Sequence, residues 1–214
     1  RGAGLQNIPQ FFISPNGNPT GTNNDIESFN DDQIHITHFY YEHKLSSNMV
    51  MSIGQLDLTA YFDTNRFANN ERIYFLANGF ANNPAIEFGG TDNFYSPGIR
   101  LTYSHNESID ITLGAAEGNG DYVDSFDKPF SMAEIDFRLA PADRKGNYRI
   151  YYWDRRGRDS LINSANPNDA NLLKAENKGA GLSIDQTITD TVGIWLRAGV
   201  QRKKVAQFDR HISG

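Results

Sequence analysis

Apolar and polar residues alternate along eight segments of this 214-residue chain, a pattern that predicts β-strands with two chemically different faces. The clearest segment is 109–117, where aliphatic residues such as Ile111 alternate with polar residues such as Thr112. The eight predicted strands are 33–43, 49–57, 98–105, 109–117, 131–140, 147–155, 179–187 and 191–202. Since strands account for nearly all of the regular pattern, we expect an all-β fold.

The connections between these segments alternate between short and long. Four of them are short turns, whereas the connections over 58–97, 118–130 and 156–178 are long. Antiparallel strands that cross a layer and turn tightly on one side only produce such alternation, and outer-membrane barrels have this form. A soluble β-sandwich with Greek-key connections can mimic it and remains an alternative. We predict an antiparallel up-and-down transmembrane β-barrel.

Composition narrows the function classes. Without Cys, the chain cannot build a disulfide framework, a thiolate zinc site or a cysteine nucleophile. A formal net charge of -6 with no Lys/Arg run argues against nucleic-acid binding. The longest apolar runs cover only a few residues, as at 73–77, so no helix is predicted to cross a bilayer. Barrel strands are compatible with this composition, because they need only alternation.

No motif in the sequence points to catalysis. There is no glycine-rich phosphate loop, no nucleophile elbow and no zinc-protease helix motif. The histidines at 35, 38 and 43 are clustered, but His35 and His38 would face opposite sides of a strand and could not share one metal. We therefore predict no enzyme, no cofactor and no metal site. An outer-membrane hydrolase barrel with these histidines as bases is the alternative.

A block over 52–86 carries a family resemblance. Its matching residues are Gly54, Leu56, Asp57, Tyr61, Phe62, Asp63, Asn65, Ala68, Asn69, Phe75, Asn82, Asn83, Pro84, Ala85 and Ile86. Further matches downstream are Pro97, Gly98, Gly120, Asp121, GNYRIYYW at 146–153 and GLSIDQTITD at 181–190. In these residues the chain resembles the carbohydrate-selective porin family (OprB-like) of Gram-negative outer membranes.

The resemblance implies a sixteen-stranded outer-membrane barrel, of which this chain would supply about half. Residues 1–31 would be a loop-rich leading segment, and 32–214 a partial porin barrel with an inward constriction segment at 58–97. An eight-stranded barrel is filled by its own side chains and could not also house that segment, so we expect further strands to complete the barrel.

The resemblance also implies a function and partners. Sugars, or inorganic ions in some relatives, would diffuse passively through the pore, and outer-membrane lipid would surround the barrel. A homo-oligomer is left open. A soluble carbohydrate-binding β-sandwich is the alternative from another class of protein.

The 58–97 connection is the first candidate for solute contact. It contains an amphipathic stretch from Asn69 to Phe80 that predicts a helix, which could narrow a lumen. The polar side chains expected near the constriction are Asp57, Asp63, Asn65, Arg66 and Arg72. The alternative is local: Asp63 and Asn65 would cap nearby backbone groups, as these residue types commonly do.

The polar face of the strands is the second candidate. Guanidinium groups make planar contacts to hydroxyls and anions, so arginines on this face could line a sugar path. They are Arg100, Arg138, Arg149 and Arg197. Hairpin parity predicts Gly114 opposite Arg100 and Gly181 opposite Arg197. The alternative role is a wall salt bridge, for example Arg149 with Asp136 across neighbouring strands.

Aromatic residues on the same face form the third candidate. Sugar rings stack on aromatic side chains, and the parity of the strands places Tyr151, Trp153 and Trp195 on the polar face. Trp153 is near a strand end, which favours a membrane-interface girdle for it. Trp195 is in the middle of a strand, so we predict stacking on a sugar there.

Overall fold

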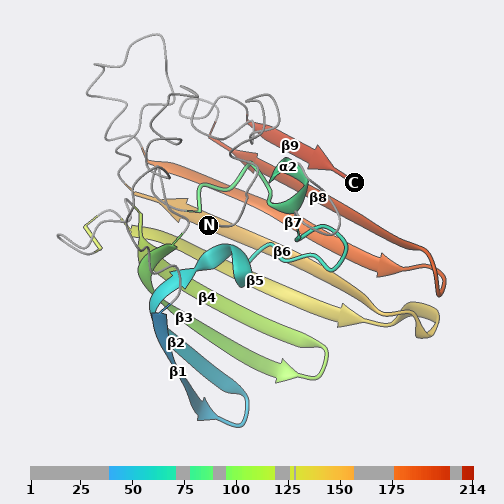
Figure 1. The fold of residues 1–214 in the computed structure, drawn as a ribbon, viewed down its shortest axis with the longest axis horizontal. Helices are drawn as coiled ribbons and strands as arrows, with labels where there is room; N and C mark the ends of the chain where they lie inside the picture. Colours follow the sequence, from blue (N-terminus) through green and yellow to red (C-terminus); the bar gives the residue numbers. More distant parts are fainter. Residues whose placement is uncertain are drawn as a thin grey trace, which may run out of the picture.

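The computed structural model describes residues 39–70, 78–88, 95–118, 126–127, 129–156, 176–202 and 209–214. The described strands are β1 (Phe39–Ser46), β2 (Met49–Asp57), β3 (Tyr95–Asn106), β4 (Ile109–Glu117), β5 (Pro129–Leu139), β6 (Gly146–Arg155), β7 (Asn177–Thr187), β8 (Gly193–Gln201) and β9 (Arg210–Ser213). They form one sheet in the order β1 to β9, each antiparallel to its neighbours (Figure 1). The predicted all-β, antiparallel up-and-down architecture is confirmed.

The connections alternate as the sequence predicts. The turns at 47–48, 107–108, 140–145 and 188–192 are short and lie together along the lower right of Figure 1. We call this side of the sheet the short-turn end. The remaining connections leave the strands at the opposite end. This arrangement follows from an uninterrupted meander, in which every second turn falls on the same side.

The strand bounds differ from the prediction at both ends of the sheet. β1 continues to Ser46, beyond the predicted end at 43, and residues 33–38 lie outside the described residues. The alternation also misses β9, because Arg210–Ser213 is too short to display a period of two. β9 extends the sheet beyond the eight predicted strands by pairing with β8.

The strand register confirms one predicted pairing and corrects another. Arg100 lies opposite Gly114, as predicted. The prediction that Gly181 lies opposite Arg197 is wrong, because Gly181 pairs with Gly199 and Ser183 takes the place opposite Arg197. The cause is the β7–β8 turn, which occupies 188–192 rather than a tight turn at Thr189 and Asp190. Such a change moves the partner by two residues and keeps every side chain on its predicted face.

The two faces of the sheet differ in chemistry. One face carries the connection that follows β2, and we call it the inner face; the opposite one is the outer face. Large aliphatic side chains stand exposed at alternate positions on the outer face: Ile53, Ile99, Leu113, Ile135, Ile150, Ile194, Leu196, Val200 and Ile212. All described strands belong to a single sheet, so the two-sheet sandwich is not what these residues form.

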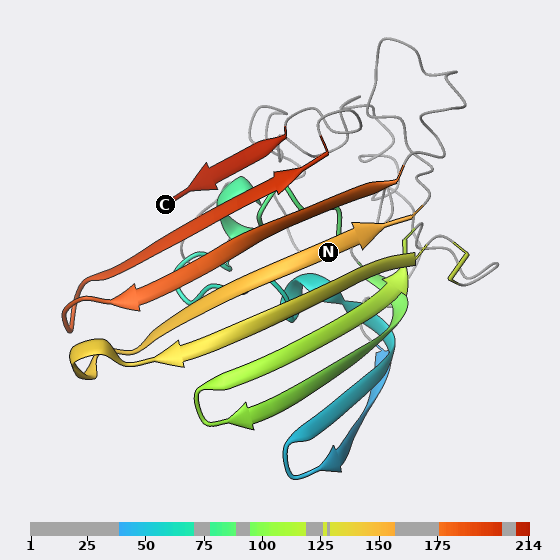
Figure 2. The same ribbon diagram turned by 180° about the vertical axis from the view of Figure 1, so that it is seen from behind.

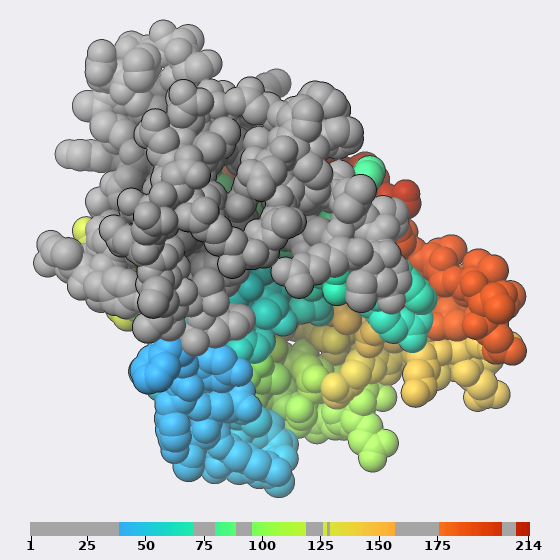
Figure 3. Space-filling view, in the orientation of Figure 1, coloured from blue at the N-terminus to red at the C-terminus, as the bar shows by residue number. Residues whose placement is uncertain are grey.

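The described parts of the connection between β2 and β3, residues 58–70 and 78–88, lie against the inner face. We call them the inserted segment. The two opposite views place it on the same side of the sheet, in front in Figure 1 and behind in Figure 2. In the space-filling view it lies over the middle strands, whose short-turn ends extend beyond it (Figure 3). Its position allows one connection to contact strands far along the chain.

The structure tests the helix predicted in the inserted segment only at its two ends. Leu58–Ala60 forms a 3-10 turn (η3), and the helix α2 (Asn78–Ala81) agrees with the end of the predicted stretch. Asn69, at its start, is not helical, and residues 71–77 lie outside the described residues. The predicted leading segment at 1–31 also lies outside them. In the described parts of the chain, no helix has the length and apolar character needed to cross a membrane.

Candidate functional site

The inserted segment begins with a capped turn and a hydrophobic anchor. Asp57 accepts a hydrogen bond from the backbone N–H of Thr59 at 2.9 Å and another from the Thr59 hydroxyl at 2.6 Å, so it caps η3. Leu58 and Phe62 are fully buried against the inner face. Phe62 lies over Gly114, where an added Cβ would come within 2.7 Å of its ring. The glycine therefore lets the segment approach the sheet closely.

This anchor is part of one hydrophobic core between the segment and the sheet. The core unites residues of the segment with inner-face residues of β2 and β4–β6: Leu56, Leu58, Phe62, Ile86, Phe88, Ala116, Phe130, Met132, Tyr151 and Trp153. All of its members are at most 5% exposed. Packing of this kind fixes the segment in place, since core side chains interdigitate with few voids.

A buried ion pair joins the segment to β8. Nε of Arg197 lies 2.9 Å from Oδ2 of Asp63, and both side chains are almost completely buried. Asp63 has a φ of 53°, in the left-handed region that Asp tolerates better than most residues. Burial raises the pKa of Asp63 to about 6, while the charge of Arg197 and the N–H of Asn83 act to lower it. At neutral pH the carboxyl is therefore ionised and paired.

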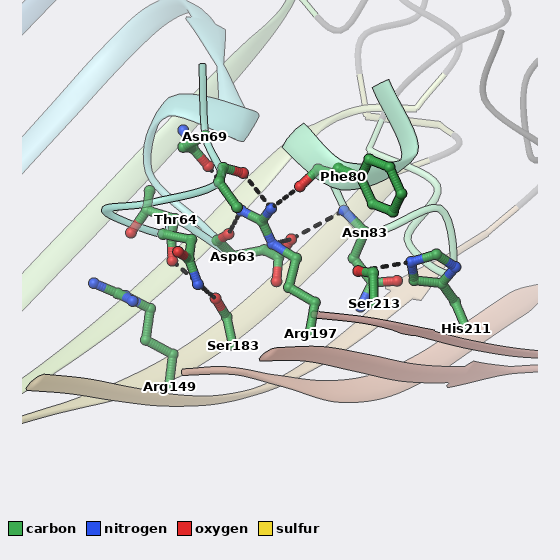
Figure 4. Close-up of polar contacts among 12 residues, drawn as sticks. Asp63, Thr64, Asn69, Phe80, Asn83, Arg149, Ser183, Arg197, His211 and Ser213 are labelled. Atoms are coloured by element: carbon green, nitrogen blue, oxygen red, sulfur yellow. Dashed lines mark hydrogen bonds and ion pairs between the residues drawn. The ribbon is translucent and has the colours of Figure 1, made fainter. Parts of the chain in front are cut away.

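Arg197 also binds backbone oxygens of the segment. Nη2 donates to the carbonyl oxygen of Asp63 at 2.7 Å and to Oδ1 of Asn69 at 2.9 Å. Nη1 donates to the carbonyl oxygens of Ala68 and Phe80. In Figure 4 the side chain rises from β8 into the segment and is surrounded by these acceptors. A guanidinium group can serve so many acceptors because its donors are spread over a planar fork.

A second polar group holds the segment over β6 and β7. Asn65 donates to Oγ of Ser183 at 3.2 Å and to the carbonyl oxygen of Ile184 at 2.9 Å. Next to it, Arg149 pairs with Asp185 at 2.9 Å and with Asp136 at 3.5 Å. The predicted wall salt bridge between Arg149 and Asp136 is therefore present, and it extends to a third strand.

The returning part of the segment is anchored by amides and tryptophan. Asn83 donates to the hydroxyl of Tyr151 at 2.7 Å, and Nε1 of Trp153 donates to the carbonyl oxygen of Ala85 at 3.1 Å. Asn177 donates to Glu87 at 2.8 Å near the start of β7. The interpretation of Trp153 as a girdle residue is wrong, because the side chain is completely buried beneath the segment.

Two other predicted arginines remain partly exposed. Arg100 has a side chain that is 14% exposed; Nη2 lies 2.8 Å from Glu42 and from Ser52. Its guanidinium stacks on the ring of Tyr61, 4.1 Å from the centroid. Arg138 is 40% exposed and makes a two-pronged contact with Asp110, at 2.7 and 3.0 Å. Neither contacts a buried part of the inserted segment in the way that Arg197 does.

Two predicted residues lie at the short-turn end. The guanidinium of Arg66 is half-exposed, lies 4.4 Å from the centre of the Phe67 ring and donates to the hydroxyl of Thr187. Trp195 is partly buried, and its ring meets that of Phe80 edge-on at 6.2 Å. Arg72 lies outside the described residues. The predicted set is thus divided between residues beneath the segment and residues beside it.

The described arginines of this set each have a carboxylate within 4 Å. The pairs are Arg66 with Asp185, Arg100 with Glu42, Arg138 with Asp110, Arg149 with Asp185 and Arg197 with Asp63. Paired charges largely cancel at a distance, so these five arginines contribute little unbalanced positive charge to the inner face. Among the residues that the structure describes, no group of three side chains could hold a metal ion.

Sequence reasoning missed several residues that make the site. Glu134 accepts the backbone N–H of Asp63 at 2.7 Å, and Asp185 bridges Arg66 and Arg149. Asn83 lies in the block that carries the family resemblance, yet nothing in its spacing shows that it binds Tyr151. The strand pattern could have identified Glu134 and Asp185 as site residues, since both are carboxylates at inner-face positions of predicted strands.

No protein-family model and no curated protein matches the chain. Its fold is similar to that of a solved high-pH structure of OprB from Pseudomonas putida, with a TM-score of 0.64 and 14% sequence identity. The similarity covers 83% of this chain and 48% of that one, so the chain spans about half the length of the solved protein. At this identity the similarity shows only that the fold is porin-like.

Proposed function

We propose that this chain forms part of a passive outer-membrane porin through which sugars diffuse along a lumen lined by arginine and aromatic side chains. The observation that carries the proposal is the outer face of the sheet. Aliphatic side chains such as Ile150, 60% exposed, and Val200, 51% exposed, recur there at alternate positions from strand to strand. Soluble proteins rarely expose so extended an apolar surface, whereas a barrel wall presents one to lipid.

The inner face supports the same proposal. It carries ion pairs, amides and hydroxyls, and the inserted segment occupies part of the space in front of it (Figures 1 and 3). A polar interior narrowed by a connection is the form of a diffusion pore. The resemblance of 52–86 to OprB-like porins and the fold shared with OprB agree with this assignment.

Charge pairing favours neutral solutes over inorganic ions. An unpaired arginine in the lumen would attract anions, but Arg100 and Arg138 each have a carboxylate at 2.8 Å or less. The remaining hydrogen-bonding capacity suits hydroxyl-rich molecules that carry no charge. A porin for inorganic ions is the competing assignment.

The proposed lining divides the candidate residues by role. Arg66, Arg100, Arg138 and Trp195 are accessible and would contact the solute, as would Arg72. The pore width would be set by residues that hold the inserted segment. They are the partly buried Asp57 and the buried Asp63, Asn65, Arg149, Tyr151 and Arg197. On this proposal no bond of the solute is made or broken, and the protein is not an enzyme.

The lipid requirement gives the first test. Purified protein should need detergent or lipid to remain dispersed, because the outer face is apolar. Dilution into plain buffer should therefore cause aggregation, measured by light scattering. A protein that stays monodisperse in plain buffer at high concentration would rule out the porin and favour the soluble carbohydrate-binding module.

Planar-bilayer conductance gives the second test. Adding a maltodextrin or glucose at millimolar concentration should reduce the ionic current, because a sugar that occupies the lumen displaces ions. Unchanged conductance together with cation selectivity would contradict the sugar assignment and support the ion porin. Absence of any channel at protein levels that insert a known porin would overturn both.

A further inference from the structure

One guanidinium group holds together two separate pieces of the inserted segment. Nη1 of Arg197 donates to the carbonyl oxygen of Ala68 and to that of Phe80, which lie on either side of residues 71–77. Figure 4 shows Phe80 and Asn69 on the two sides of this side chain. Because one nitrogen serves both carbonyls, the side chains next to them are brought to the same part of β8.

These side chains are aromatic. Phe67 precedes Ala68, and its ring lies so close to Gly193 that any side chain at that position would overlap it. The ring of Phe80 meets that of Trp195 at 6.2 Å with an angle of 74°. Gly193, Trp195 and Arg197 alternate along β8 and face the same side. We call Phe67, Phe80 and Trp195 the aromatic cluster; it lies at the short-turn end of the inner face.

The aromatic cluster differs from the other rings of the inner face. Phe88, Phe130 and Trp153 pack on one another and are at most 3% exposed, which is what a hydrophobic core requires. Phe80 is instead 42% exposed, and Phe67 is only partly buried. The backbone next to these two rings is bound by the buried Arg197, yet the rings themselves are not enclosed in the hydrophobic core.

A polar group suited to hydroxyls lies beside the rings. Arg66 stacks on Phe67 and keeps 41% of its side chain exposed. Its contacts to Thr187 and, at 3.9 Å, to Asp185 fix it at the end of β7. The partly exposed rings of Phe80 and Trp195, together with a guanidinium oriented by its stacking on Phe67, match the two sides of a pyranose ring, which has apolar C–H faces and a rim of hydroxyls.

We propose that the aromatic cluster and Arg66 form a pyranose-binding platform at the short-turn end of the lumen, and that Arg197 is the positioning residue that assembles it. The platform is separate from the contact between Arg100 and Tyr61, which lies on the β1–β3 side of the sheet. This inference rests on the proposed sugar porin and adds to it a defined solute contact. Arg197 itself is completely buried and touches no solute.

The chain supplies its own reporter for the platform. It contains two tryptophans, of which Trp153 is completely buried and Trp195 belongs to the aromatic cluster. Maltotriose added to the detergent-solubilised protein should change the tryptophan emission and protect it from iodide quenching at millimolar concentrations. The response should disappear in Trp195→Phe and persist in the matched control Trp153→Phe. A response that survives in Trp195→Phe, or no response in the native protein, overturns the platform.

Removing a second ring tests the composition of the platform. Phe80→Leu should weaken the apparent affinity for maltotriose by about two- to tenfold, because an aromatic contact of this kind is lost. Tyr152→Leu changes a half-exposed ring on the outer face and should leave the affinity unchanged. Equal affinities for Phe80→Leu and the native protein would remove Phe80 from the platform and contradict the proposal.

The positioning role is tested with Arg197→Lys. Lysine keeps the charge that pairs with Asp63 but lacks the fork that joins Ala68 to Phe80. We expect maltotriose binding about tenfold weaker than in the native protein. The denaturation midpoint should stay close to that of the control Arg156→Lys, which changes an exposed arginine paired with Asp154 and should keep the native affinity. Native affinity in Arg197→Lys would overturn the positioning role, since a purely structural ion pair would be retained.

Conductance separates this inference from the function on which it rests. If maltotriose blocks the current but leaves Trp195 unaffected, the sugar porin stands and the platform is wrong. If Trp195 responds while the current is unaffected, the platform is supported and the assignment of sugar as the transported solute is wrong.

Discussion

Two arginines on the same face of the same sheet have different environments. Arg197 in β8 lies under the inserted segment and is completely buried, with an ion pair and four further acceptors around it. Arg138 in β5 lies beyond the segment, is 40% exposed and binds Asp110. Residue type, face and strand periodicity are equal in the two regions. An arginine covered by the inserted segment is buried in structural contacts, whereas one beyond it remains exposed to solvent.

The largest difference between the two regions should appear in stability. Arg197→Ala leaves Asp63 buried without its partner, which typically costs about 3–5 kcal/mol. Arg138→Ala removes a largely exposed pair and should cost about 0–1 kcal/mol. Chemical unfolding in detergent, followed by tryptophan emission, measures both variants. Similar losses would show that the segment does not distinguish the two regions.

Close packing in the covered region gives a smaller effect. Gly114→Ala places a methyl group within 2.7 Å of the Phe62 ring and should destabilise the fold by about 1–3 kcal/mol. Phe62→Leu, with its shorter side chain, should recover part of this loss in the double variant, although it costs stability alone. The same unfolding assay, applied to both single variants and to the double variant, completes a double-mutant cycle. Additive losses would mean that the ring and the methyl group do not meet.

The buried pair also predicts a dependence on pH. The pKa of Asp63 is raised to about 6, so between about pH 4 and 6 the folded protein retains a proton that the unfolded chain has released. The contribution of Asp63 to the free energy of unfolding is therefore greatest at low pH and falls as pH rises through this window. Comparison with Asp63→Asn isolates it, because Asn does not titrate. Parallel pH profiles for the two proteins would contradict the assignment.

The smallest effect on stability, and a clear effect on selectivity, is expected at Arg100. Its loss removes a contact to Tyr61 worth about 0.5–1 kcal/mol and leaves Glu42 unpaired. The lumen should become more favourable to cations, as the reversal potential across a salt gradient would show. Arg197→Ala should also shift the ion selectivity toward cations, provided that the variant still forms channels. No shift with Arg100→Ala would mean that this side chain does not face the pore.

The sequence predicts well which face of a strand a residue lies on. It predicts poorly whether that residue is buried and what it contacts. Alternation requires only neighbouring residues, so it correctly places Arg100, Arg149 and Arg197 on one face. The short β3–β4 turn and the register shift between Ser104 and Asn106 then set Gly114 opposite Arg100. Burial on that face depends on the inserted segment, whose contacts are distant along the chain. Trp153 is therefore misread as a girdle residue, and the contact of Glu134 with the backbone of Asp63 is not predicted.

The two described ends of the stretch predicted as a helix, Asn69 to Phe80, show a similar limit. Phe80 lies in α2, as the apolar spacing predicts, whereas Asn69 is not helical. Arg197 binds the side chain of Asn69 and the carbonyl oxygen of Phe80. Local periodicity cannot reveal these contacts, because Arg197 is distant along the chain.

The placement of the inserted segment also has a consequence for the order of folding. The meander forms from pairings between consecutive strands, but the segment precedes most of the strands that hold it: 118 residues separate Asn65 from Ser183, and 134 separate Asp63 from Arg197. Contacts of such long range form slowly, because the loop they close is large. The segment can settle only after β8 has joined the sheet. Assembly should therefore pass through a species in which β8 has joined the sheet while the inner face is still uncovered, and docking of the segment follows. On the proposed function, the lumen narrows at that later step.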